Sequence, residues 1–96
     1  MFFVYILKSL KDGKFYTGST GNIKDRLQRH YEGRVKSTRN RRPLKLVYFE
    51  KFDNRSEAVK REMYLKSLEG GARKKELVDN FPEEKLREIE GLLSCG

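Results

Sequence analysis

Two tyrosines, Tyr5 and Tyr16, lie in short stretches of β-branched and aromatic residues on either side of Asp12-Gly13. Asp-Gly is a strong hairpin turn signal, so the two stretches are expected to pair as antiparallel strands. A phenol hydroxyl can carry a proton in acid–base chemistry once a nearby cation or metal lowers its pKa, which is ordinarily about 10. The pair is therefore a candidate for proton transfer, and the alternative is that both are ordinary amphipathic strand residues.

Turn arithmetic predicts where the two hydroxyls point. If Asp12 and Gly13 are the central residues of a two-residue turn, Tyr5 faces Thr20 and Tyr16 faces Ser9. Both tyrosines then emerge on one face, about 13 Å apart along the strands, with Gly18 in the gap. A four-residue loop keeps the shared face and a three-residue loop reverses it. A glycine inside a strand often marks close approach of a ligand or another backbone.

A histidine and an arginine accompany the apolar stripe of the helix expected next. The stripe consists of Ile23, Leu27 and Tyr31. His30 falls inside this stripe and Arg26 lies at its edge, so both should point toward the sheet or its rim. The alternative for His30 is a core histidine whose ring nitrogens are satisfied by hydrogen bonds.

A carboxylate interrupts the apolar side of the following helix in the same way. The apolar arc consists of Ala58, Val59, Met63 and Leu65. Glu62 falls within this arc, and a buried carboxylate needs a cation, a metal ion or a place at the rim. The alternative is an ordinary i,i+4 pair with Lys66.

Positive charge is concentrated in one segment of the chain. The whole chain carries +8, and residues 24–45 hold nine Lys/Arg against two acids, which gives +7. Localised positive charge attracts polyanions, so nucleic acid is the expected partner, with a merely soluble surface as the alternative. The side chains expected to contact the phosphate backbone are Arg29, Lys36, Arg39, Arg41, Arg42 and Lys66.

The elements that must position these groups can be read from periodicity and capping signals. Strands are expected at 2–8, 14–19 and 44–52, and helices at 22–32, 54–68, 72–80 and 83–93, with the second helix stopping at Gly70-Gly71. The fold class is α+β, in ββαβαα order, with a small three-stranded sheet flanked by helices. The third strand could pair on either side of the hairpin. The acidic last helix is expected to pack on the core through Leu86 and Ile89, with a dimer surface or a lid over the basic face as alternatives.

Composition excludes several classes of protein. One cysteine and one histidine allow neither an intrachain disulfide nor a Cys/His zinc site, which fits a reducing, cytoplasmic compartment. The apolar run of residues 1–7 is too short to cross a bilayer, and without a basic leader or small-residue cleavage site it does not read as a signal peptide. We expect neither membrane association nor a small-molecule cofactor.

The ordered set of these residues resembles the GIY-YIG nuclease domain, in particular its small stand-alone bacterial members. The likeness rests on Phe3-Val4-Tyr5, Tyr16-Thr17-Gly18, Arg26-Leu27, His30 and the Ala58…Glu62…Lys66 spacing. The Gly and Ile of the first motif are Phe3 and Val4 here, and the middle of the second motif is Thr17. The likeness covers roughly residues 2–78, so residues 1–80 form the GIY-YIG-like domain and residues 81–96 a C-terminal helical extension of it.

The resemblance implies an antiparallel sheet and a metal-dependent endonuclease of the DNA repair or processing class. It implies that Glu62 holds one divalent ion, Mg²⁺ or Mn²⁺, and that Tyr16 is the general base. Tyr5 and His30 would support that group, and Arg26 would contact the scissile phosphate. Two alternatives are a catalytically weak or inactive module that binds nucleic acid through residues 24–45, and an interaction protein whose basic face meets acidic protein or RNA.

Overall fold

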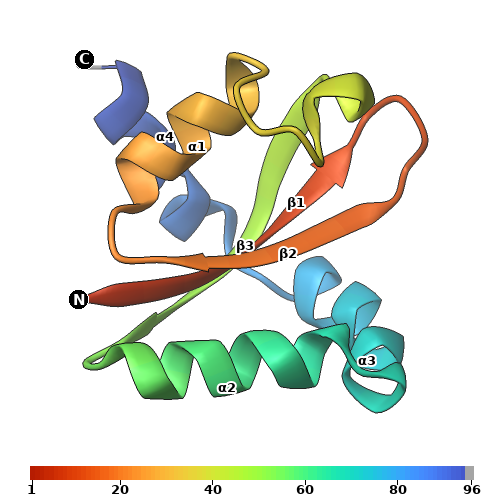
Figure 1. Ribbon diagram of the computed structural model, residues 1–96, viewed down its shortest axis with the longest axis vertical. Helices are drawn as coiled ribbons and strands as arrows, with labels where there is room; N and C mark the ends of the chain where they lie inside the picture. Colours follow the sequence, from red (N-terminus) through yellow and green to blue (C-terminus); the bar gives the residue numbers. More distant parts are fainter. Residues whose placement is uncertain (95–96) are drawn as a thin grey trace.

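The fold is a three-stranded antiparallel sheet with helices on both faces, which confirms the predicted α+β class (Figure 1). The computed structural model describes the backbone of residues 1–94 and the side chains of residues 1–91, so Cys95 lies outside the described part. The strands are β1 (Phe2–Ser9), β2 (Phe15–Thr20) and β3 (Leu44–Phe52), and the helices are α1 (Ile23–Tyr31), the 3₁₀ turn η1 (Arg39–Arg41), α2 (Arg55–Lys66), α3 (Leu68–Asp79) and α4 (Glu83–Ser94). The strand order β2-β1-β3 places the third strand beside the first. None of the helices within residues 1–94 is long and apolar enough to cross a membrane.

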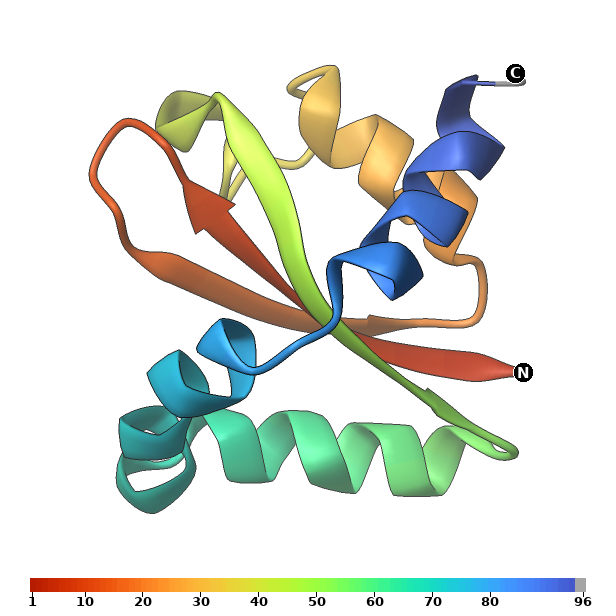
Figure 2. The ribbon, with the colours of Figure 1, turned by 180° about the vertical axis from the view of Figure 1, so that it is seen from behind.

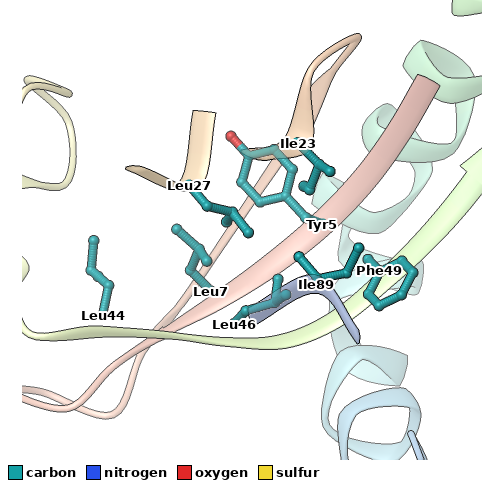
Figure 3. Packing of buried hydrophobic residues seen from close by; sticks show 8 residues of the cluster. All are labelled: Tyr5, Leu7, Ile23, Leu27, Leu44, Leu46, Phe49 and Ile89. Carbon is teal, nitrogen blue, oxygen red and sulfur yellow. The ribbon is translucent and has the colours of Figure 1, made fainter. Parts of the chain in front are cut away.

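The helices form two layers, one on each face of the sheet. Figures 1 and 2 show α1 and α4 on one side of the strands and α2 and α3 on the other. On the α1 side, Tyr5 and Leu7 pack with Leu27 of α1 and Ile89 of α4 (Figure 3). On the α2 side, Val4 and Ile6 alternate with those residues along β1 and pack on α2. The burial of Ile89 confirms that the last helix packs on the core.

The hairpin register differs from the expected one. The tip is a four-residue loop, in which the Ser9 N–H donates to the Lys14 carbonyl at 2.9 Å and the Gly13 N–H donates to the Ser9 carbonyl at 2.8 Å. The Ser9 hydroxyl oxygen accepts from the backbone N–H groups of Lys11 and Asp12, which stabilises this wider loop over the two-residue turn. Tyr5 therefore pairs with Gly18, and Leu7 pairs with Tyr16. The assignment of Thr20 opposite Tyr5 was wrong, and the tyrosines are two residues apart in register instead of four.

Helices α1 and α2 begin at the N-cap residues that the sequence predicts. The Asn22 side chain accepts from the Asp25 N–H at the start of α1, and the Asn54 side chain accepts from the Glu57 N–H at the start of α2. These bonds satisfy backbone donors that have no partner within the first turn of a helix.

The end of α2 was predicted incorrectly. The helix stops at Lys66, and Ser67 caps the start of α3 by accepting from the Gly70 N–H. Gly70 is buried against the end of α2, where a Cβ would overlap the Tyr64 carbonyl oxygen. The Gly70-Gly71 pair is thus a packing contact inside α3 rather than a helix stop.

The apolar arc expected on α2 is also corrected. Ala58 and Leu65 are buried, but Met63 is 67% exposed. The inward stripe runs through Ala58, Glu62 and Leu65 at i, i+4 and i+7. Ala58 and Leu65, rather than Val59 and Met63, define the buried side of α2. Glu62 lies between them in this spacing, so it still points toward the sheet.

One hydroxyl on the α2 face predicts a stabilising substitution. Thr17 is 3% exposed, and its Oγ1 has no hydrogen-bond partner among the described residues. We expect Thr17→Val to raise the free energy of unfolding by about 1 kcal/mol, because it removes a desolvated polar group without changing the side-chain shape. Urea denaturation measures this. Thr20→Val is the matched control and should destabilise, since the Thr20 hydroxyl accepts from the Asn22 N–H at 3.0 Å.

Candidate active site

Three rings from three different elements meet on the α1 face of the sheet. The Tyr5 and Tyr16 ring centroids are 6.5 Å apart, and the His30 ring lies 5.6 Å from the first and 5.2 Å from the second. Tyr5 comes from the central strand β1, Tyr16 from the edge strand β2 and His30 from α1. The expectation that both tyrosines share one face is confirmed.

His30 is the centre of a buried hydrogen-bonded chain. The Tyr5 hydroxyl lies 2.9 Å from His30 Nε2, and His30 Nδ1 lies 2.8 Å from Thr38 Oγ1. All three side chains are fully buried. His30 is therefore a core histidine with both ring nitrogens hydrogen-bonded, and its ring packs against both tyrosines. Thr38 was not among the predicted site residues, because it lies in a polar, basic loop that carries no apolar pattern.

Burial keeps the hydrogen-bonded side chains of Tyr5, His30 and Thr38 uncharged. Desolvation, and next the Arg26 charge, lower the pKa of His30 from 6.5 to about 4. Burial, and next the proximity of Tyr16, raise the pKa of Tyr5 well above its usual value of 10, against the opposing effect of Arg26. We assign the phenol proton of Tyr5 to the bond with Nε2, which leaves an N–H at Nδ1 to donate to Thr38.

Gly18 makes room for the Tyr5 ring. It is the direct cross-strand partner of Tyr5, and a Cβ at this position would lie 2.5 Å from the Tyr5 hydroxyl oxygen. The close approach that the strand glycine indicated is therefore made by a tyrosine of the same sheet.

Glu62 reaches the same strand from the opposite face. Its Oε1 accepts from the Ser19 hydroxyl at 2.5 Å, and its Oε2 accepts from Lys66 Nζ at 2.7 Å. Burial alone would raise the pKa of Glu62, but the hydrogen bonds from Lys66 and Ser19 and the nearby Lys66 and Arg26 charges outweigh it, so the pKa lies below its usual value. The i,i+4 pair with Lys66 and the inward position thus exist together.

Arg26 connects the two faces across the β2 edge. Its charge acts on Tyr5 and His30 on one side and on Glu62 on the other. Within residues 1–94, β2 has no strand partner on its outer side, and in Figure 1 it runs between α1 and α2. The structure thus gathers Tyr5, Tyr16, Arg26, His30 and Glu62 around β2, with Tyr5 buried on the central strand behind that edge.

The donor set at Glu62 suits a hard divalent ion that retains water. The described residues contain no group of three or more His, Cys, Asp or Glu side chains that could surround a metal. Glu62 offers carboxylate oxygens beside the Ser19 hydroxyl, and Mg²⁺ commonly binds one or two carboxylates and keeps several waters. Oxygen donors at a partly exposed rim therefore fit Mg²⁺ or Mn²⁺, provided that Lys66 releases its oxygen.

The predicted nucleic-acid contacts divide into two groups. Three already form an ion pair with an acidic side chain: Arg29 with Asp25, Arg41 with Asp12 and Lys66 with Glu62. Lys36, Arg39 and Arg42 are exposed and lie on the loop that follows α1. Lys66 lies on α2, beyond the opposite face of the sheet, so it does not belong to the surface formed by that loop.

The Arg42 side chain is held in place against the loop backbone. Its Nε donates to the Arg39 carbonyl oxygen at 3.1 Å. A Cβ at Gly33, whose φ is +78°, would meet the Arg42 guanidinium. The guanidinium group is thus anchored at Nε, and its two terminal nitrogens have no hydrogen-bond partner among the described residues, so they can contact a phosphate.

The fit between Gly18 and Tyr5 predicts a costly substitution. Gly18→Ala should lower the free energy of unfolding by about 1–3 kcal/mol, because the buried ring has no room to move away. Gly91→Ala is the matched control: Gly91 lies within α4, none of the described residues comes within 4 Å of where a Cβ would be, and the change should stabilise by about 0.5–1 kcal/mol. Urea denaturation of both variants makes the comparison, and a neutral Gly18→Ala would contradict the packing described.

The buried imidazole predicts an unusual titration. His30, the only histidine in the chain, should titrate with a midpoint of about 4 by proton NMR. The unfolded chain binds this proton near pH ~6.5, so the unfolded state holds more protons between about pH 4 and 6.5. Stability should therefore fall as pH falls through that window, and His30→Gln should lack this component. A midpoint of 6.5 or higher would contradict the buried, neutral state.

Comparison with known proteins assigns the chain to a family. Residues 1–76 match the model of the GIY-YIG catalytic domain. A UPF0213 protein of Clostridium perfringens is 52% identical over 69 residues, which cover 71% of this chain and 73% of that protein, and one of Syntrophus aciditrophicus is 43% identical over 83 residues, covering 84% and 93%. The solution NMR structure of a UPF0213 protein from Bacillus halodurans is 36% identical, covers 76% of this chain and 81% of that one, and superposes with a TM-score of 0.47. The chain therefore belongs to the GIY-YIG family, and its function is of the nuclease type.

Proposed function

We propose that the protein is a metal-dependent endonuclease that hydrolyses DNA phosphodiester bonds, with Tyr16 as the general base and Glu62 as the ligand of one Mg²⁺ or Mn²⁺ ion. The observation that carries the proposal is the contrast between the two tyrosines. Tyr5 is 0% exposed and its pKa is raised, whereas Tyr16 is only partly buried in the same ring cluster. A base must reach the proton that it removes, so Tyr16 is the one suited to act on a water at the surface.

The buried chain behind Tyr16 supports its position. The hydrogen bonds from Tyr5 to His30 and on to Thr38 hold the rings that Tyr16 packs against. Arg26 supplies the cation of the site, and its charge already acts on Tyr5, His30 and Glu62. Arg26 would stabilise a phenolate at Tyr16 and bind the non-bridging oxygens of the scissile phosphate.

Glu62 would hold the divalent ion, with the Ser19 hydroxyl beside it. When bound, the ion supplies positive charge that offsets the negative charge developing on the phosphate oxygens. Lys66 then has to release Glu62 Oε2, and its freed ammonium group becomes available for a flanking phosphate. Lys36, Arg39 and Arg42 would position the strand through backbone contacts that carry no sequence information.

A second function is favoured by one specific observation. Both oxygens of Glu62 are already satisfied, by Ser19 and by Lys66, so a metal ion competes with an existing ion pair. A protein in which that pair persists would bind nucleic acid through the basic segment and turn over slowly or not at all.

Nicking assays separate the two functions. Wild type, Tyr16→Phe and Glu62→Gln are incubated with plain and branched DNA in Mg²⁺, in Mn²⁺ and in EDTA. We expect Tyr16→Phe to lower kcat by about 10²–10⁴ because it removes the base. Glu62→Gln should lower it by about 10³ or more, because the ion would lose its only charged protein ligand.

Matched controls keep the comparison specific. Tyr64→Phe removes a hydroxyl and Glu57→Gln removes a carboxylate elsewhere on α2, and both should retain wild-type rates. DNA binding without nicking in either metal would refute the endonuclease and support the binding module. Absence of DNA binding even at low salt would overturn both proposals and favour contacts with another acidic partner.

A further inference from the structure

A cavity of about 200 Å³ lies beside the candidate active site, and of the residues that line it only Ser19 and Arg26 have a role in the functions assigned above. It is lined by Phe2, Ser19, Thr20, Gly21, Arg26, Arg55, Ala58 and Val59. Two of these residues connect it directly to the site: Ser19 donates to Glu62, and Arg26 acts on both faces of the β2 edge. Whatever occupies the cavity is therefore adjacent to the phosphate that is cleaved.

The charge of the cavity selects an anion. Its lining contains two guanidinium groups, Arg26 and Arg55, and no acidic side chain. Among the described residues, Arg55 makes no ion pair or side-chain hydrogen bond, unlike Arg29 and Arg41. Arg55 is exposed, and a cation without an acidic partner attracts phosphate, for which the planar guanidinium group is well suited.

The helices around the cavity add to the same preference. Arg26 and Arg55 lie in the first turns of α1 and α2, and both helices begin on the side of the molecule where β1 starts (Figure 1). The N-terminal end of a helix carries partial positive charge and favours an anion nearby. Arg26 and Arg55, one from each of these first turns, thus both line one small space.

The size and the apolar side of the cavity indicate what accompanies the anion. Phe2, Ala58 and Val59 form its apolar wall, and Phe2 is a half-buried aromatic ring. Gly21 brings the backbone against this ring, since a Cβ there would lie 3.1 Å from it. Pockets for drug-sized ligands occupy about 300–1,000 Å³, so this cavity suits a single planar group. An aromatic ring beside two cations fits one nucleobase and its phosphate.

We infer that this cavity binds the nucleotide next to the scissile phosphate, with the scissile phosphate between Arg26 and Arg55 and the base of that nucleotide unstacked against Phe2. The inference rests on the proposed nuclease function, and it adds Arg55 and Phe2 as substrate-binding residues. A base can enter only if it leaves its stack, so the site favours single-stranded or frayed DNA over an intact duplex.

Binding measured in EDTA tests the inference without any turnover. Fluorescence anisotropy compares a labelled single-stranded oligonucleotide with an abasic strand of equal length, for wild type, Phe2→Leu and Arg55→Ala. Phe2→Leu keeps an apolar side chain in place, and urea denaturation verifies that each variant is folded. Lys60→Ala is the matched control, because it removes an exposed cation of α2 that does not line the cavity.

Each substitution has its own signature. Phe2→Leu should weaken binding of the base-containing strand about tenfold and leave the abasic strand unchanged, as expected for the loss of one stacked base. Arg55→Ala should weaken both strands and reduce the salt slope, d log K/d log[salt], by about 0.7 in magnitude, as expected for one lost phosphate contact.

Three results would overturn the inference. They are an equal loss for both strands in Phe2→Leu, an Arg55→Ala effect no larger than that of Lys60→Ala, and no binding of single strands by wild type. Failure of the nuclease proposal looks different, because DNA would then be bound with these signatures but not nicked in Mg²⁺ or Mn²⁺.

Discussion

The hydrogen bond between the Tyr5 hydroxyl and His30 Nε2 connects the central strand of the sheet to α1. Because both side chains are fully buried, neither could lose its partner without a desolvation penalty of about 1–3 kcal/mol. The second ring nitrogen extends the connection to Thr38, which anchors the basic loop. Gly18 permits the arrangement by leaving space for the Tyr5 ring. The relative position of β1, α1 and the basic loop therefore depends on one buried, uncharged series of hydrogen bonds.

The two outer strands of the sheet have different surroundings. Phe81 packs against both Tyr48 and Phe49, which point to opposite faces of β3, so its ring covers part of that edge. Covering an edge strand removes a surface prone to pairing with other chains. At the β2 edge, in contrast, polar groups from both faces come together. Tyr16 approaches from the α1 side and Glu62 from the α2 side, with Arg26 acting on both.

The charged groups of this edge are held by interactions that a substrate would have to replace. Lys66 pairs with Glu62, and in the basic segment Arg29 and Arg41 pair with Asp25 and Asp12. Pairs at this degree of exposure contribute little to stability, about 0–1 kcal/mol each, so exchanging them for phosphate contacts costs little. The buried Tyr5–His30 bond is different, because breaking it would leave two buried polar groups without partners.

Local signals in the sequence determined much of this protein. Runs of β-branched and aromatic residues located the strands, and the Asn22 and Asn54 caps located the helix starts, because these signals depend on neighbours within a few residues. Out-of-pattern polar residues identified His30 and Glu62, since a helix stripe exposes an intruder by its spacing alone.

The tertiary structure decided what depends on distant contacts. The hairpin register followed from the Ser9 hydroxyl, which also donates to the Arg41 carbonyl 32 residues away. Gly70 lies inside a helix because its missing side chain lets α3 pack on the end of α2. Thr38 and Arg55 carry no local pattern, and only the folded chain places one against His30 and the other in the cavity. Spacing along the chain predicts which side chains share a face of one element, but the meeting of faces from β2, α1 and α2 at one edge is a property of their packing.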